Sequence, residues 1–286
     1  LAKLVHLDET DHHVMIMCGM SAAFAAVFGT PMAAAVFAME VVSVGVMYYA
    51  ALLPCVIASI IAAEFATGVG LNPETFPVAR IPQLSVESSL KMAVIAAGCG
   101  LLSILFCVAL KAVSGIYGKY LKNPYLRVCV AGCLVIGITM LLGTGDYMGA
   151  GNELIARAVE QGKARPLDFL WKMILTAITM RAGYRGGEIV PAFSVGATFG
   201  CVAGGLLGFS PEVAAAASMV ALFCGVTNCP IASMLISFEL FGFSGAAYYL
   251  IAISISYALS GYYSLYKDQT IVYSKYKARY INKKTH

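Results

Sequence analysis

The sequence contains two stretches that share one pattern, AAFAAVFGTPMAAAVFAME at residues 22–40 and ALFCGVTNCPIASMLISFE at residues 221–239. In each, a phenylalanine stands seven residues before a proline and a glutamate stands nine residues after it. Proline breaks or kinks a helix, and a carboxylate inside so apolar a run is costly unless it is paired or functional. Matched segments of this kind in two halves of a chain are typical of inverted-repeat transporters.

The rest of the 286-residue chain is equally apolar, with 60% hydrophobic and 12% charged residues, whereas soluble domains carry about 25% charged residues. A helix needs about 20 apolar residues to cross a bilayer. We therefore expect an all-α integral membrane protein in a lipid bilayer, with an inverted-repeat topology and discontinuous, tilted helices. One transmembrane domain is expected over residues 1–266 and a basic C-terminal segment over residues 267–286. The uncharged blocks behind this prediction are 14–39, 41–63, 92–110, 128–145, 189–211, 213–238 and 240–266.

The placement of charge predicts an orientation. Residues 111–127 carry four basic residues and no acid, and the tail carries six basic residues against Asp268. Residues 64–91 carry three acids and two bases. The positive-inside rule places the first two regions in the cytoplasm and the third outside. We expect a multi-pass protein of the inner (plasma) membrane with a cytoplasmic C-terminus and no nucleic-acid partner, because the basic residues follow a membrane edge.

Nothing in the sequence favours catalysis or a metal site. The nine cysteines lie in apolar stretches without a CxxC pair, so we interpret them as small buried hydrophobes. His12 and His13 stand in a charged loop, and no histidine joins the cysteines at metal-ligand spacing. We expect no cofactor and no enzymatic activity. The glycines at 196, 200 and 204 predict close packing of a helix rather than a substrate site.

The turn Gly186-Gly187-Glu188-Ile189-Val190-Pro191 is the candidate functional site. Glycine permits a tight approach to a helix start, and proline is favoured in the first helical turn. The first N–H groups of a helix have no internal partner, and with the helix dipole they bind anions. The alternative is that they face a neighbouring carbonyl. Glu188 is either a protonated donor to the anion, since burial and a nearby anion favour protonation, or a carboxylate paired with Arg185 or Arg181.

Five segments in order resemble the CLC family of chloride channels and anion transporters. They are Phe28–Glu40, Gly149–Ile155, Gly186–Pro191, Asn228–Glu239 and Ile271–Tyr273. The resemblance implies a homodimer with one anion pathway per subunit. It also implies that Gly186, Gly187 and Glu188 form the anion-binding turn, that the backbone N–H groups of Ile189 and Val190 hold the central anion, and that the Tyr273 hydroxyl binds it from the cytoplasmic side.

Two departures refine the resemblance. Val41 stands where chloride/proton exchangers of the family place an inner proton glutamate, and Tyr184–Glu188 is similar to the bacterial fluoride/proton antiporter branch. The resemblance thus implies proton-coupled fluoride export, with fluoride or chloride and protons as partners. The alternatives are a chloride channel, a chloride/proton exchanger, or a non-functional fragment of one. From the apolar start at Leu1–Leu7 we expect an N-terminally truncated member, with the family's gating Gly-x-Glu-x-Pro motif lying upstream.

Overall fold

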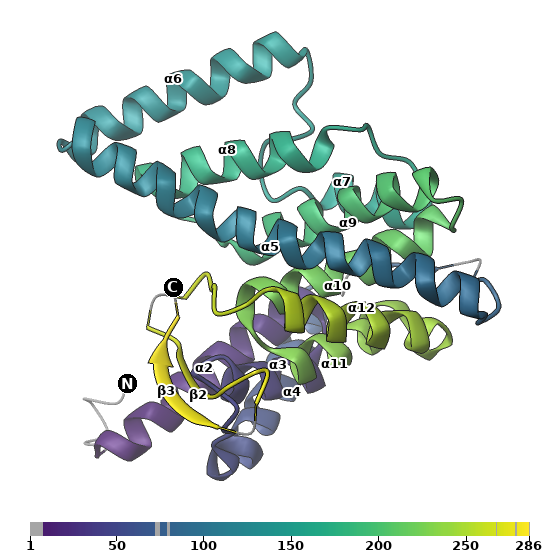
Figure 1. Cartoon of the computed structure of the whole chain (residues 1–286). Coiled ribbons are helices and arrows are strands. Elements are labelled where there is room, and N and C mark those ends of the chain that lie inside the picture. The colour runs from purple at the N-terminus through teal and green to yellow at the C-terminus, as the bar shows by residue number, and fades with distance from the viewer. Residues whose placement is uncertain (1–7, 72–74, 79–80, 267, 278, 286) are drawn as a thin grey trace.

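The computed structural model describes residues 8–71, 75–78, 81–266, 268–277 and 279–285. The expectation for Leu1–Leu7 therefore falls outside the described residues. The described chain is mainly helical (Figure 1). Its helices are α2 (Glu9–Phe28), α3 (Pro31–Glu40), α4 (Leu52–Gly68), α5 (Val86–Tyr120), α6 (Pro124–Leu142), α7 (Asn152–Glu160), α8 (Asp168–Ala182), α9 (Ile189–Leu206), α10 (Pro211–Thr227), α11 (Pro230–Phe241) and α12 (Ala246–Leu259).

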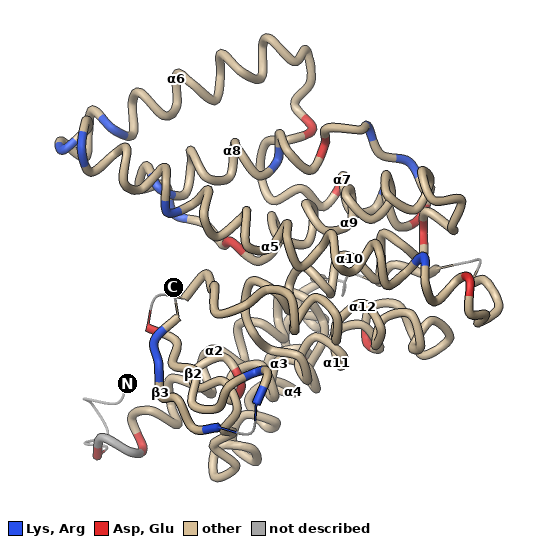
Figure 2. Tube along the Cα trace, viewed as in Figure 1, with Lys and Arg blue, Asp and Glu red and all other residues tan. Residues whose placement is uncertain are grey.

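Several of these helices satisfy the length and hydropathy that a bilayer requires. Among the described residues, five segments are long and apolar enough to span it: Asp11–Phe28, Tyr49–Gly68, Val86–Tyr120, Pro124–Leu142 and Ile189–Leu206. Charged residues gather mostly in the loops and at the helix ends, and most helix interiors carry none (Figure 2). The shorter apolar helices α3, α10, α11 and α12 pack among the long ones, as expected for discontinuous helices in a membrane domain.

The longest helix, α5, crosses the middle of the molecule (Figure 1). It begins with a capping box in which the Ser85 side chain and the Ser88 side chain each bond the other's backbone N–H. Helices α8 and α9 pack against it on one side and α10 and α12 on the other. Helix α5 therefore joins the part of the fold that contains the Gly186–Pro191 turn to the part that contains α3 and α11.

The two repeat segments fold as predicted, each into a helix, a break and a second helix. Helix α2 ends at Gly29, whose φ of 66° is left-handed, and α10 ends at Asn228, whose φ is 60°. Such a residue stops a helix, and the proline that follows can open the next one because it needs no N–H partner there. Pro31 begins α3 and Pro230 begins α11.

The glutamates at the ends of these helices pair with the opposite repeat. The Glu40 carboxylate accepts hydrogen bonds from the backbone N–H groups of Ile231 (3.1 Å) and Ala232 (2.8 Å). In the same way the Glu239 carboxylate accepts from Met32 (3.0 Å) and Ala33 (2.9 Å). Helices α3 and α11 therefore lie antiparallel, and each caps the other. A carboxylate at a helix N-terminus satisfies unpaired donors and complements the dipole.

The expected packing role of Gly196, Gly200 and Gly204 is confirmed. A Cβ atom added at Gly196 would lie 2.6 Å from the Ser218 carbonyl oxygen, and one at Gly204 would lie 2.6 Å from the Ala214 Cβ. At Gly200 the added atom would overlap the Ala214 carbonyl oxygen and the Ser218 side chain. Small residues let helix backbones approach closely, so α9 and α10 lie nearly in backbone contact.

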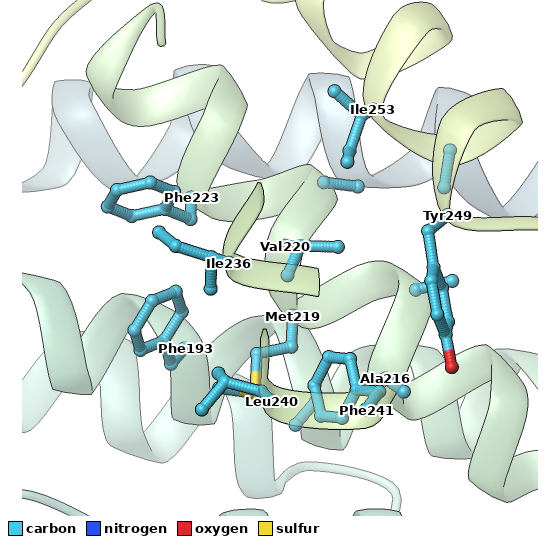
Figure 3. Close-up of a cluster of buried hydrophobic side chains, with 14 of the residues drawn as sticks. Phe193, Ala216, Met219, Val220, Phe223, Ile236, Leu240, Phe241, Tyr249 and Ile253 are labelled. Atoms are coloured by element: carbon cyan, nitrogen blue, oxygen red, sulfur yellow. The ribbon is translucent and has the colours of Figure 1, made fainter. Parts of the chain in front are cut away.

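An apolar cluster fills the space between α9, α10, α11 and α12 (Figure 3). Phe193 on α9 contacts Phe223 on α10, with ring centroids 5.1 Å apart, and Phe28 meets the edge of Phe193 at 5.6 Å. Aromatic pairs in such arrangements add stability beyond the area they bury. Phe193 lies four residues after Ile189, so this cluster fixes the first turns of α9.

The tail adds an element that the all-α prediction lacked. Strands β2 (Thr270–Tyr273) and β3 (Tyr280–Lys284) pair antiparallel, and β2 also pairs in parallel with β1 (Ser43–Val44), just after α3. Lys275 lies between β2 and β3, and its ammonium donates to Asn228, to Ser260 Oγ (3.0 Å) and to the Tyr257 carbonyl (3.2 Å). Burial lowers the pKa of Lys275 to about 8. The basic tail is thus bound to the α10–α11 connection.

The interpretation of the cysteines as buried needs one correction. Cys129 and Cys133 are exposed on α6, whereas Cys18 is half-buried and the other six are buried. Helix α6 packs mainly against α8, so most of its surface faces away from the rest of the chain. In a bilayer that surface would face lipid or another protein chain, and a cysteine there is still in apolar surroundings.

Replacing either capping carboxylate by an amide should destabilise the α3–α11 pair. We expect Glu40→Gln and Glu239→Gln each to lower the free energy of unfolding by about 1.5–3 kcal/mol, the usual contribution of a hydrogen bond to a charged group. Unfolding in mixed dodecylmaltoside and dodecylsulfate micelles, followed by circular dichroism, measures this. Glu64→Gln, on the exposed face of α4, is the matched control. An equal loss in all three variants would contradict the capping role.

Adding one methyl group at the α9–α10 contact should separate the two helices. We expect Gly200→Ala to cost about 1–3 kcal/mol of unfolding free energy, the typical penalty for overpacking. Gly205→Ala on the same helix meets no atom within 4 Å, so its higher helix propensity should leave stability unchanged or raise it by up to about 1 kcal/mol. The same unfolding assay compares them, and a harmless Gly200→Ala would rule out the close approach.

Candidate functional site

The Gly186–Pro191 turn joins α8 to α9. Helix α8 ends at Ala182, and Gly183, with φ 114°, takes a conformation that a side chain would strain. Residues 184–188 are irregular, and α9 begins at Ile189 with Glu188 at the position before it. Gly186 and Gly187 are exposed, whereas Glu188, Ile189 and Val190 are half-buried. The helix start predicted from the sequence is therefore present at the predicted residue.

The first backbone donors of α9 lack a partner within the helix. The N–H of Ala192 bonds the Glu188 carbonyl at 3.1 Å, and Pro191 has no N–H. The N–H groups of Ile189 and Val190 precede that first bond and therefore have no acceptor in the helix. Among the described residues, no carboxylate bonds them in the way that Glu40 and Glu239 bond α11 and α3. The start of α9 is thus a helix end with backbone donors from which an external anion could accept hydrogen bonds.

Glu188 pairs with Arg181, one of the two arginines expected as alternatives. The Arg181 Nη2 lies 2.7 Å from the Glu188 Oε1, and both side chains are about one-fifth exposed. A partly buried ion pair of this length is a charge-assisted hydrogen bond. Arg181 thus links the end of α8 to the residue that stands directly before the Ile189–Val190 donors.

The glycine-rich loop at residues 149–151 docks onto the same helix. Gly149 and Gly151 have left-handed φ values of 64° and 100°. The Ser194 hydroxyl lies 3.0 Å from the Gly151 carbonyl and 3.1 Å from the Val190 carbonyl in the first turn of α9. The buried Lys172 ammonium on α8 donates to the carbonyls of Gly149 (2.8 Å) and Tyr147 (3.1 Å). The Lys172 ammonium and the Ser194 hydroxyl therefore bond the same loop, and Ser194 also bonds the first turn of α9.

A polar network holds this loop from the other side. The buried Asp168 accepts from the Tyr147 hydroxyl (2.7 Å), from the Arg165 N–H (2.8 Å) and, more weakly, from Arg157 (3.5 Å). Arg157 also pairs with Asp146 at 3.1 Å, and hydrogen bonds from Thr144 and Arg157 lower the pKa of Asp146. Asp168 and Lys172 are one helical turn apart on α8, so a single helix face positions the whole loop.

Within the part of the chain that the structure describes, the contacts of Tyr273 lie away from the turn. Its side chain is 48% exposed on β2, and its ring meets the Tyr280 ring edge-on at 5.9 Å. Its backbone and Cβ instead approach Gly45 beside β1. The role of Tyr273 as an anion ligand therefore stays a prediction from the resemblance.

Tyr266 is a second tyrosine to consider. Its side chain packs against the two largest apolar clusters, of which one contains Ala192 and Val195 of α9 and the other is also packed by Ile189 and Val190. Sequence reasoning missed this residue because Leu265-Tyr266 ends an uncharged block and resembles ordinary core. Lys172 was also missed, although a lysine in the middle of an apolar helix is a recognised signal of function.

These observations define the class of the protein as a polytopic membrane protein with an inverted repeat and broken helices. The family model of the voltage-gated chloride channels matches residues 1–261. The chain belongs to this family, the CLC channels and transporters.

Individual relatives agree with the family assignment. The chain is 34% identical over 284 residues to a chloride/fluoride channel protein of Pseudomonas syringae pv. tomato, covering 96% of this chain and 62% of that protein. It is 25% identical to an H⁺/Cl⁻ exchange transporter of Vibrio cholerae, covering 82% of this chain and 53% of that protein. The chain thus spans less than two thirds of the length of these two relatives.

Solved structures give the same result for the fold. A crystal structure of a CLC-type fluoride/proton antiporter superposes with a TM-score of 0.85 at 32% identity, covering 88% of this chain and 64% of the other. A slow cyanobacterial Cl⁻/H⁺ antiporter superposes with a TM-score of 0.71 at 16% identity, which supports the fold alone.

Proposed function

We propose that this chain carries out proton-coupled fluoride transport across the inner membrane, as part of a CLC-type antiporter. The observation that carries the proposal is the start of α9, where the Ile189 and Val190 N–H groups have no acceptor within the helix and Glu188 stands directly before them. A chloride/fluoride channel protein 34% identical to this chain and the fold of a fluoride/proton antiporter support fluoride over chloride.

The site suits a small anion that must bind and leave. Backbone donors and a helix dipole attract an anion without a full positive charge, and conduction needs binding that is favourable but weak. When Glu188 is ionised and paired with Arg181, it repels an approaching anion. When protonated, it can donate a hydrogen bond, and fluoride is a strong acceptor. Glu188 is thus our candidate for the residue that links proton and fluoride.

Orientation and assembly are part of the same proposal. The basic residues 111–127 and the basic tail favour a cytoplasmic C-terminus by the positive-inside rule. A homodimer is consistent with the apolar side chains that α4 exposes, among them Leu53, Ile61 and Phe65. Lipid covers any of this surface that a second copy does not cover.

A chloride channel or exchanger is the second candidate. The channel form of this candidate is favoured by Val41, a buried apolar residue directly after Glu40, because an apolar side chain there offers no proton relay, which an exchanger needs. The two candidates are separated by measuring whether transport is selective for fluoride and how many protons move with each anion.

Transport in liposomes tests the proposal. Two proteins are reconstituted: this chain, and a chimera that joins it to the part of the Pseudomonas syringae relative outside the match. Efflux of fluoride and chloride is followed with ion-selective electrodes, and proton movement with a pH electrode. We expect fluoride efflux coupled to proton uptake in the chimera. Chloride efflux as fast as fluoride efflux in the chimera would contradict the fluoride assignment.

In the chimera, removing the ionisable group at position 188 should impair fluoride transport selectively. We expect Glu188→Gln to reduce fluoride efflux by roughly tenfold to a hundredfold, as the loss of a charge-assisted hydrogen bond implies, and to abolish its coupling to protons. Glu160→Gln at the exposed end of α7 is the control. If Glu188→Gln leaves the fluoride-to-chloride ratio unchanged, the chloride alternative is preferred.

The tyrosine ligand can be identified by paired substitutions. If Tyr266 holds the anion, Tyr266→Phe should weaken fluoride binding to the purified chain by roughly tenfold, whereas Tyr273→Phe should leave it unchanged. Isothermal titration calorimetry measures both. The opposite result would assign the role to Tyr273, and equal binding by both variants would exclude a tyrosine ligand.

A further inference from the structure

A polar cavity lies next to the ion pair of the Glu188 turn. It has a volume of about 100 Å³ and is formed by the last turns of α5, the end of α8 and the segment after α12. Its polar lining consists of Lys111, Ser114, Arg181 and Ser264. We call it the basic cavity. Because a water molecule occupies about 30 Å³, the cavity has room for roughly three waters or for a small anion with part of its hydration shell.

The residues that line the basic cavity range from exposed to buried. Lys111 is exposed, Ser114 and Arg181 are half-buried, and Ser264 is buried. Arg181 in turn contacts Glu188. The cavity therefore joins the surface at the basic loop, residues 111–127, to the residue that stands directly before the Ile189–Val190 donors.

The charges around the cavity favour an anion. Two cations, Lys111 and Arg181, stand among the residues that line it, and Arg181 is paired with one carboxylate, Glu188. Two cations against one acid leave a positive potential in a partly desolvated space, where such charges act more strongly than in bulk water. A cation would be repelled, and an apolar ligand would offer no acceptor to the Lys111 ammonium or to the Nε of Arg181.

Arg181 has hydrogen-bonding capacity to spare. A guanidinium carries five N–H donors, and its Nη2 serves Glu188. Within the described part of the chain, its Nε is buried with no hydrogen-bond partner. A buried donor without an acceptor is costly and calls for an explanation. An anion in the basic cavity would supply that acceptor while Arg181 keeps its contact with Glu188.

We propose that the basic cavity is a second binding site for a small inorganic anion, held by Lys111 and Arg181 with the hydroxyls of Ser114 and Ser264. During transport the anion occupies this site before it reaches the Ile189–Val190 turn. This order of binding rests on the proposed transport function. The nearby Glu188 carboxylate opposes tight binding, so the anion can leave again. Arg181 is the shared element, because it faces the anion on one side and Glu188 on the other.

Anion binding to the purified chain tests the site without any transport assay. Fluoride and bromide are titrated by calorimetry into the chain and into Lys111→Met, Lys111→Arg and Lys119→Met. We expect Lys111→Met to weaken one anion site by roughly tenfold to a hundredfold and Lys111→Arg to keep it. Lys119 is exposed on the last turn of α5 beside Tyr120, so Lys119→Met should bind like the unmodified chain. Equal binding by Lys111→Met and Lys119→Met overturns the proposal.

Diffraction from bromide-soaked crystals gives a second readout that needs no folded variant. We expect an anomalous peak between Lys111 and Arg181, separate from any peak at the Ile189–Val190 turn. A peak at the turn alone overturns the proposal. Failure of fluoride transport in liposomes with the cavity peak present would refute the proposed function and leave this site standing.

Discussion

The fold depends on how helices that end inside an apolar region satisfy their backbone donors. Lipid offers no hydrogen bonds, so a broken helix at membrane depth needs a partner from the protein. Helices α3 and α11 meet this need reciprocally, because Glu40 bonds the start of α11 and Glu239 bonds the start of α3. Each glutamate is itself stabilised by the helix it caps, which explains why two carboxylates are tolerated in such apolar segments.

Helix α9 differs from α3 and α11 in the partner of its first turn. Glu188 lies just before this helix and turns its carboxylate to Arg181, so the Ile189 and Val190 donors remain for another acceptor. The same physical requirement that makes the α3 and α11 starts structural makes the α9 start a candidate binding site. Its position is fixed on one side by Ser194 and the glycine-rich loop, and on the other by Phe193 and the apolar cluster.

Part of the site was predictable because its signals are local. The helix start after Gly186-Gly187, the close packing of Gly200 and the break at Pro31 each follow from the conformational limits of one or two residues. The contacts of Glu40 with the start of α11 and of Glu239 with the start of α3 were predictable only as a sequence pattern. Equal spacing from a proline indicated a repeat, but it could not say that each carboxylate bonds the other segment. Tyr266 could not be found, because a tyrosine at the end of an apolar block is usual in any core.

The sequence by itself determined that this is a membrane protein of the CLC family, where its helices break, and which turn is the candidate anion site, because apolar length, proline and glycine act locally. Only the tertiary structure decided which charges meet. Arg181 rather than Arg185 pairs with Glu188, Lys172 bonds the loop at Gly149, and the tail forms a sheet with β1. Arg185 is closer to Glu188 along the chain than Arg181 is, and the Lys172 and tail contacts join distant segments, so position along the chain does not reveal which residues meet.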